Sequence, residues 1–260
     1  MLTALPAIVV GCVVLSAASA PQDHLKFTRD QLQRIRGLHL GYVMTLIYEL
    51  LLLLLLPVAQ LFSPLLSLLL IGLALVLMLF VNRFSGMRHT RPLMVALGST
   101  AIGLEVIWRA ALVLDPAWGR LITLPHVGVW IVFLVAVVVR GVNALIREPF
   151  VTMSVLLGAA SGYLTLGIAG GVVLNSLWIL QPSAFLTSAL PSLSGNTVSD
   201  PAVASALMTA SFGLLTSAGT AVINSRNVTV TVLGTLITVS GQLYIAILIG
   251  LILGRVQRRL

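Results

Sequence analysis

The stretch from Asp200 to Gly254 reads DPAVASALMTASFGLL (200–215), TSAGTA (216–221), VINSRN (222–227) and VTVTVLGTLITVSGQLYIAILIGLILG (228–254). It combines an uncharged segment rich in small residues, a short polar loop and a long apolar segment. Asp200 is a favourable helix N-cap, and Pro201 suits the first helical position because no backbone donor is needed there. The stretch therefore predicts a short helix, a non-helical loop and a membrane-spanning helix.

The short helix is predicted to enter the membrane and return to the side from which it came. Its 14 residues from Ala202 to Leu215 would rise about 21 Å, less than the hydrocarbon core of about 30 Å. Extension to Ile223 would make the segment long enough, so length leaves both alternatives open. A crossing segment would place the basic C-terminus opposite every other basic loop, against the positive-inside rule. We therefore expect a re-entrant helix.

Polar side chains recur along one face of the final helix. Their spacing of 4, 3 and 4 residues places them in register at 3.6 residues per turn. In lipid such a face must contact protein or water. A single threonine can instead bond back to its own helix, but four polar residues in register favour a packed or wetted face. They are Thr231, Thr235, Thr238 and Gln242.

The helix, loop and helix resemble the pore module of tetrameric potassium channels, whose selectivity filter reads Thr-Val-Gly-Tyr-Gly followed by Asp. In that family a glycine hinge lies 22 residues beyond the first filter glycine, and Gly241 lies 22 residues after Gly219. The run GQLY (241–244) also resembles bacterial channels of this class that carry four extra helices before the pore. The resemblance extends from about Arg140 to Arg255 and is only architectural before that.

The resemblance implies an altered filter. The threonine, valine and first glycine of the family correspond to Ser217, Ala218 and Gly219. The tyrosine, second glycine and aspartate correspond to Thr220, Ala221 and Val222.

The resemblance also implies a homotetramer, since one chain supplies one pore module. The carbonyl end of the pore helix would then favour a monovalent cation on the axis, with potassium as the candidate. Thr235 and Thr238 would lie behind the pore helix. The implied ion pathway is Thr216, Ser217, Ala218, Gly219, Thr220 and Ala221. The implied cavity lining is Gln242, Ile245 and Ile249, and the implied hinge is Gly241.

The loop is not expected to form the four-site potassium filter. A Cβ at Ala221 would disfavour the left-handed backbone there by about 1 kcal/mol per subunit. Thr220 lacks the aromatic ring that could brace the loop, and Val222 lacks the acidic group at the outer mouth. A ring of Ser217 hydroxyls, with Thr216 beside it, would be the site retained. The sequence thus predicts a pore that is weakly selective among monovalent cations, or closed.

Composition places the whole chain in the membrane. Of its 260 residues 58% are hydrophobic and 8% are charged, a pattern that no soluble core explains. The net charge of +8 belongs to loops between spans, so it indicates orientation and not nucleic-acid binding. The single Cys12 excludes an intrachain disulfide and a cysteine-based metal cluster.

The predicted architecture is an all-α polytopic membrane protein with six transmembrane helices and the re-entrant pore helix, in contact with membrane lipids. The resemblance implies the bacterial plasma membrane. The spans are placed at about 38–62, 65–82, 93–114, 121–140, 150–174 and 229–254, with an external loop at 175–199. Twelve basic residues fall on one side, which is therefore predicted to be cytoplasmic, and Arg120 and Arg226 fall on the other. The twelve are Lys26, Arg29, Arg34, Arg36, Arg83, Arg88, Arg91, Arg140, Arg147, Arg255, Arg258 and Arg259.

Three parts follow from this arrangement: an N-terminal hydrophobic segment with a basic cytoplasmic linker (1–37), a four-helix membrane domain (38–148) and the potassium-channel-like pore module (149–260). The ending of Leu2–Ala20 imitates a signal-peptide cleavage site but lacks a preceding basic residue. Cleavage would place the following basic residues outside, against the topology. An extra span and a segment lying along the membrane remain as alternatives.

Three charged residues lie inside spans, where such groups are functional candidates. Glu49 is midway along the first span, and Glu105 and Arg109 are four residues apart, so they are expected to pair on one helix face. The first four spans lack the arginine repeat of a voltage sensor. In the fifth span, Gly158 with Gly162 and Gly167 with Gly171 make small-xxx-small pairs that allow close helix approach.

No enzyme constellation, cofactor motif or metal-ligand spacing is present in the sequence, and the histidines are scattered. The first functional hypothesis is therefore the pore-forming subunit of a tetrameric cation channel. The second is a non-conducting, channel-like structural or regulatory membrane subunit. The third is a small secondary transporter, which would need an inverted repeat with a second broken helix in the first half.

Overall fold

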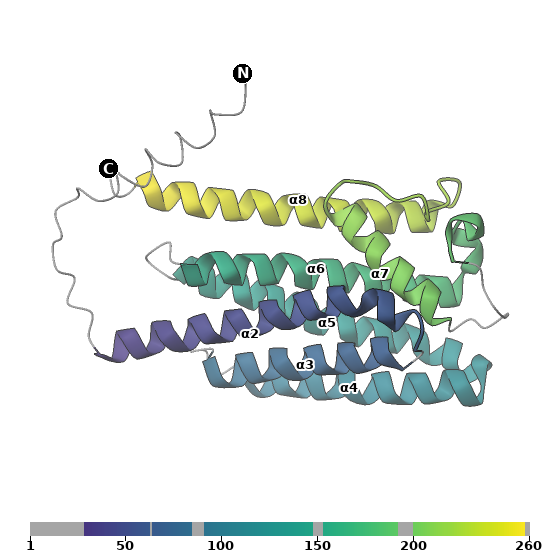
Figure 1. Cartoon of the computed structure of the whole chain (residues 1–260), viewed down its shortest axis with the longest axis horizontal. Helices are drawn as coiled ribbons and strands as arrows, with labels where there is room; N and C mark the ends of the chain where they lie inside the picture. The colour runs from purple at the N-terminus through teal and green to yellow at the C-terminus, as the bar shows by residue number, and fades with distance from the viewer. Residues whose placement is uncertain (1–28, 63, 85–90, 148–152, 192–199, 258–260) are drawn as a thin grey trace, which may run out of the picture. The chain divides into compact units, whose positions relative to one another are not determined.

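The computed structural model describes residues 29–62, 64–84, 91–147, 153–191 and 200–257. Residues from Ile35 onward form one compact unit, and the helices below are described within it; of the earlier part, Arg29–Arg34 form the first turns of a helix. Among the described residues, six helices are long and apolar enough to cross a membrane, so the protein is an all-α polytopic membrane protein (Figure 1). They are α2 (Arg29–Ala59), α3 (Leu65–Phe84), α4 (Arg91–Leu114), α5 (Pro116–Arg147), α6 (Met153–Leu180) and α8 (Val228–Gln257).

The short helix α7 (Pro201–Leu215) is re-entrant, as predicted. After α7 the chain returns to the end of the bundle at which α6 ends (Figure 1). There the Leu186 N–H donates to the Val222 carbonyl at 2.8 Å, and the Asn224 N–H donates to the Ala184 carbonyl at 3.2 Å. These bonds join the segment that follows α6 to the segment that precedes α8. The former contains two short 3-10 helices, η2 (Pro182–Ala184) and η3 (Thr187–Ala189).

Helix α6 is the central helix of the unit. In its most apolar stretch 67% of the residues are buried, against 17% in α8, and α6 packs against α5, α7 and α8. Its predicted small-xxx-small pairs do permit close approach, but each glycine accommodates a large side chain from another helix. Gly158 contacts Tyr42, Gly162 contacts Tyr244, Gly167 contacts Phe212 and Gly171 contacts Met208.

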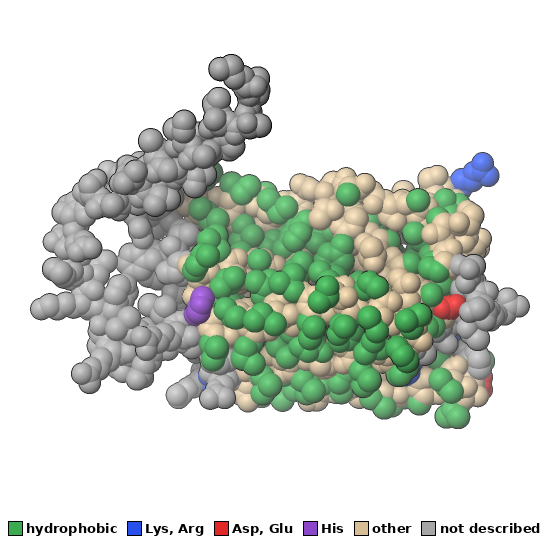
Figure 2. Space-filling model, in the orientation of Figure 1, with side chains coloured by type: hydrophobic (Ala, Val, Ile, Leu, Met, Phe, Trp, Pro, Cys, Tyr) green, Lys and Arg blue, Asp and Glu red, His purple; other side chains and the backbone are tan. Residues whose placement is uncertain are grey.

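Apolar side chains cover the outside of the bundle. Leu54, Val113 and Leu114 are 74%, 75% and 84% exposed, which suits contact with lipid chains rather than water. Figure 2 shows hydrophobic side chains across the visible face, with the visible charged side chains at its margins.

Six of the described arginines lie at the ends of the bundle to which they were predicted to belong. Consecutive spans run in opposite directions (Figure 1), so four arginines near helix termini lie at one end, here called the basic end; Arg120 and Arg226 lie at the other. The four are Arg83 of α3, Arg91 of α4, Arg147 of α5 and Arg255 of α8. Lys26, Arg88, Arg258 and Arg259 lie outside the described residues.

We expect the basic end to be cytoplasmic, because translocation of basic loops is disfavoured. Single cysteines can be introduced as Arg88→Cys, Arg258→Cys and Ser188→Cys in a Cys12→Ser background. An impermeant thiol reagent added outside cells should label the Ser188→Cys variant, in the predicted external loop, and leave the other two unlabelled until the cells are permeabilised. The reverse pattern, or equal labelling of all three, would contradict this orientation.

Helices α5 and α6 extend into segments that were predicted to be loops. Helix α5 begins at Pro116, before the predicted 121, because the Asp115 carboxylate accepts a hydrogen bond from the Ala117 N–H at 2.9 Å and caps the helix. Helix α6 continues to Leu180, so the prediction of a loop over 175–180 is wrong. The Ser176 hydroxyl donates to the Val172 carbonyl at 2.8 Å, so its polarity is satisfied inside the helix.

At the N-terminus, residues 1–28 lie outside the described residues, and so does the predicted hydrophobic segment within them. The predicted linker is helical from Arg29 onward, because α2 continues the first span towards the N-terminus as far as Arg29. The predicted boundary between the four-helix domain and the pore module, at 148–149, also lies outside the described residues.

Candidate ion-pathway site

The start of α7 is fixed by the predicted cap. The Asp200 carboxylate accepts a hydrogen bond from the Ala202 N–H at 2.8 Å, and Pro201 occupies the first turn. Farther along, the Ser211 hydroxyl donates to the Gly167 carbonyl of α6 at 2.7 Å. The glycine allows α7 to approach α6 closely enough for this bond.

The carbonyl end of α7 is satisfied within the chain. A helix normally ends with four carbonyl groups that lack an intrahelical partner. Here each of the four accepts a hydrogen bond, two of them from side chains of neighbouring spans. The Phe212 carbonyl accepts from the Thr216 N–H (3.0 Å), Gly213 from the Gly219 N–H (3.0 Å), Leu214 from the Thr238 hydroxyl (3.0 Å) and Leu215 from the Tyr163 hydroxyl (3.1 Å).

The loop after α7 has left-handed backbone at two alternate positions. Ser217 has φ 60° and Gly219 has φ 81°; the non-glycine position is the costlier one. Among the described residues no other position has positive φ, so Ala221 does not adopt a left-handed conformation. Gly213 permits the loop to fold back, because a Cβ there would lie 2.5 Å from the Gly219 carbonyl oxygen.

Helix α8 contacts this loop through one face. The Gln242 amide donates to the Ser217 hydroxyl at 2.8 Å, so two residues of the predicted ion pathway and cavity lining contact each other. One residue earlier, a Cβ at Gly241 would lie 2.6 Å from the Leu215 carbonyl oxygen. Gly241 therefore sits where α8 passes the end of α7, and its predicted role as a hinge stays a prediction.

Most of the predicted pathway and cavity residues are exposed in the single chain. Ile245 is 37% exposed and Ile249 is 52% exposed. Loop positions Thr216, Ser217, Ala218, Gly219 and Ala221 are exposed as well, and Thr220 is half-buried.

The polar stripe of α8 divides into two parts. Thr238 contacts α7, the helix it was predicted to back, and Gln242 reaches the loop. The prediction that Thr235 backs the pore helix is wrong. Thr231 and Thr235 are exposed, and their hydroxyls donate to carbonyls one turn back in the chain, at 2.8 and 2.9 Å.

A buried polar cluster between α4 and α5 was missed in the sequence. The predicted interaction of Glu105 with Arg109 is electrostatic; in addition, Glu105 Oε2 accepts from His126 Nε2 at 2.7 Å and from Trp130 Nε1 at 3.1 Å. The His126 ring stacks on Trp108 with centroids 4.3 Å apart. His126 and Trp130 are four residues apart and so share a helix face, which was the available signal.

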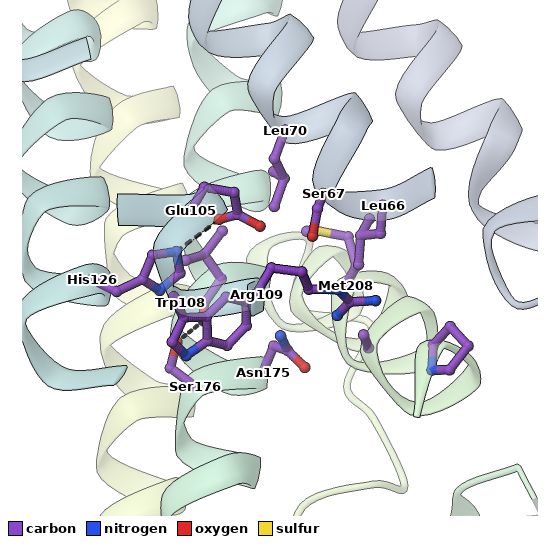
Figure 3. A pocket seen from close by; sticks show the side chains of 13 residues that line it. Leu66, Ser67, Leu70, Glu105, Trp108, Arg109, His126, Asn175, Ser176 and Met208 are labelled. Carbon is purple, nitrogen blue, oxygen red and sulfur yellow. Dashed lines mark hydrogen bonds and ion pairs between the residues drawn. The ribbon is translucent and has the colours of Figure 1, made fainter. Parts of the chain in front are cut away.

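The cluster borders a small cavity that α7 also lines (Figure 3). The cavity has a volume of about 30 Å³, enough for one or two water molecules. Glu105 Oε1 and His126 Nδ1 are buried without a hydrogen-bond partner, and Figure 3 shows the Arg109 guanidinium directed towards Met208 of α7. The α7 residues that line the cavity are Pro201, Ala204 and Met208.

The described residues hold no group of three or more His, Cys, Asp or Glu side chains that could bind a metal ion. The chemistry available at the loop is therefore that of hydroxyl groups, one amide and backbone carbonyls. Neither a family model, nor a curated protein, nor a solved structure matches this chain, so the case for its function rests on its own residues.

Proposed function

We propose that the chain is the pore-forming subunit of a homotetrameric, potassium-channel-like cation channel with an altered filter, in the bacterial plasma membrane. The observation that carries this proposal is the re-entrant helix and loop between α6 and α8, with Ser217 hydrogen-bonded to Gln242 at 2.8 Å. A re-entrant loop at membrane depth needs a protein or aqueous surrounding, which a pore provides.

Exposure of the loop and of α8 supports assembly with further copies. Residues 216–219 are exposed in the single chain, and lipid offers no partner for any polar group there that the chain leaves unbonded. Leu236 and Leu243 of α8 are 59% and 58% exposed, so this helix has apolar surface available for lipid or for neighbouring subunits. Four copies around an axis would place the four loops against one another and enclose water.

We expect weak selectivity among monovalent cations. Only Ser217 and Gly219 have left-handed backbone in the described residues, so the alternation that aims successive carbonyls at an axis stops before Ala221. Planar-bilayer recording of the purified protein under potassium–sodium gradients tests this expectation. A reversal potential that shows potassium preferred over sodium by more than about tenfold would contradict it.

The second candidate function is a non-conducting, channel-like structural or regulatory subunit. It is favoured by the carbonyl end of α7, whose four carbonyls already accept hydrogen bonds from the chain, which weakens their attraction for a cation. A purified tetramer that gives no current in bilayers would support this function over the first. A transporter is less favoured, because the described residues show a re-entrant helix only between α6 and α8; a monomer or dimer would support it.

A further inference from the structure

Polar side chains pair across the interface between α2 and α6. Both helices begin at the basic end (Figure 1), so they run in parallel. Paired residues keep a nearly constant separation of 115 or 116 positions, which means that the two helices pack in register. From the basic end inward, the pairs are His39 Nδ1 with Ser154 Oγ (3.2 Å), Thr45 Oγ1 with Ser161 Oγ (3.2 Å), and Glu49 Oε1 with Thr165 Oγ1 (2.6 Å).

The pairs lead from an exposed position to a fully buried carboxyl group. His39 is exposed, Ser161 and Thr45 are 6% and 1% exposed, and Glu49 is 0% exposed. The rise from His39 to Glu49 is about 15 Å, half of a hydrocarbon core of about 30 Å. The row therefore ends near the middle of the membrane.

Hydroxyl groups surround the Glu49 carboxyl. The Thr165 hydroxyl of α6 donates to Oε1, and Ser161 of α6 lies beside the carboxyl group. Tyr244 of α8 is close enough to interact electrostatically with Glu49. The neighbouring Tyr48 is directed elsewhere, since its hydroxyl donates to the Leu69 carbonyl. Glu49 Oε2 is buried and has no hydrogen-bond partner. An ionised carboxylate among hydroxyls alone is costly in the membrane interior, and a bound proton removes that cost.

We propose that Glu49 is a proton-binding site, loaded from the basic end of the bundle along the polar pairs of α2 and α6. A hydronium ion transfers its proton to Oε2, which forms the O–H bond of a neutral carboxyl group and releases water. Oε1 stays hydrogen-bonded to Thr165 in both states, so Oε2 is the atom that changes. The 2.6 Å contact between Oε1 and the Thr165 hydroxyl leaves no room for a metal ion between them.

Proton loading would also reach the pore module. The Tyr244 hydroxyl donates to the Ala159 carbonyl at 2.8 Å, close to Ser161 on α6. Tyr244 lies three residues after Gly241 on α8. The site therefore borders the part of α8 that follows its contact with the pore helix.

Infrared difference spectroscopy of the full-length protein in lipid tests this site without relying on conduction. Between about pH 5 and about pH 9, the C=O stretch of a protonated carboxyl should change in the wild type. That change should be lost in Glu49→Gln and retained in Glu105→Gln. Thr165→Val keeps the carboxyl but removes its hydrogen bond, so the band should remain and shift in frequency.

Two further measurements test the route and the ligand. Ser161→Ala should slow the response of the band to a pH jump at the basic end, while Ser240→Ala on α8 should not. Identical pH difference spectra for the wild type and Glu49→Gln would overturn the proposal. A Glu49 signal that follows sodium at constant pH would also overturn it. The infrared measurement follows the Glu49 carboxyl itself and does not depend on conduction. A protein that conducts no ions but keeps the pH-dependent carboxyl band would therefore contradict the proposed channel function and not the proton-binding site.

Discussion

Replacing Glu105 with alanine is expected to lower the free energy of unfolding by about 3 kcal/mol, because two buried donors would lose their shared acceptor. The carboxylate accepts from His126 at 2.7 Å and from Trp130 at 3.1 Å. Glu105 is 1% exposed and His126 is 2% exposed, so water does not replace the lost acceptor freely. Each orphaned donor costs about 1–3 kcal/mol.

Chemical unfolding in detergent micelles, followed by circular dichroism, measures this effect. Glu105→Gln is the matched control, since its amide oxygen can still accept from both rings, and it should lose less than half as much stability. Thr100→Ala gives a surface comparison on the same helix, because the exposed Thr100 hydroxyl donates to the Ala96 carbonyl of α4 at 2.8 Å. Equal stability of Glu105→Ala and the wild type would show that the cluster does not stabilise the fold.

Replacing Gly241 with alanine is expected to cost about 1–3 kcal/mol, as overpacking against a fixed backbone group does. The new Cβ would lie 2.6 Å from the Leu215 carbonyl oxygen and 2.9 Å from Leu215 Cδ1. Since Leu215 ends α7, relief of the clash must move α8 or the end of α7. The bond between Gln242 and Ser217 would be strained by the same movement, so a conducting protein should also change its open probability.

Two glycines of the same helix provide controls. A Cβ at Gly250 would meet nothing within 4 Å, so Gly250→Ala should be neutral or stabilising by up to about 1 kcal/mol. At Gly234 the nearest atom is the tip of the Ile223 side chain at 3.0 Å, which can yield. In thermal unfolding and single-channel recording, Gly241→Ala should therefore have a larger effect than Gly250→Ala or Gly234→Ala. Equal effects at Gly241 and Gly234 would count against both the packing role and a hinge.

The spans and the re-entrant helix could be predicted because the membrane imposes length and charge directly on the sequence. The N-cap at Asp200 could be predicted for a local reason, since a carboxylate before Pro201 satisfies the first turn. The same Asp-Pro signal stands at Asp115 and marks the true start of α5, although the hydropathy pattern placed that start later.

Contacts between distant helices could not be predicted from local spacing. Glu105 has Arg109 four residues away on its own helix, but its hydrogen bonds go to a helix 21 and 25 positions along the chain. The satisfied carbonyl end of α7 likewise depends on Tyr163 of α6 and Thr238 of α8. Thr235 and Thr238 lie on one face by periodicity, yet only Thr238 is close to α7. Helix packing, which hydropathy does not encode, decides such partners.

The position of α7 has a consequence for the order in which the protein is made. Helix α7 packs against α3 and α6, which are synthesised before it, and against α8, which is synthesised after it. Its end is held by Thr238, and the return of its loop by the bond between Asn224 and Ala184. A ribosome that has released α7 but not α8 therefore leaves a short apolar helix without its final support. We therefore expect α7 to complete its docking late in biogenesis, once α8 has entered the membrane and Thr238 can bond to the Leu214 carbonyl.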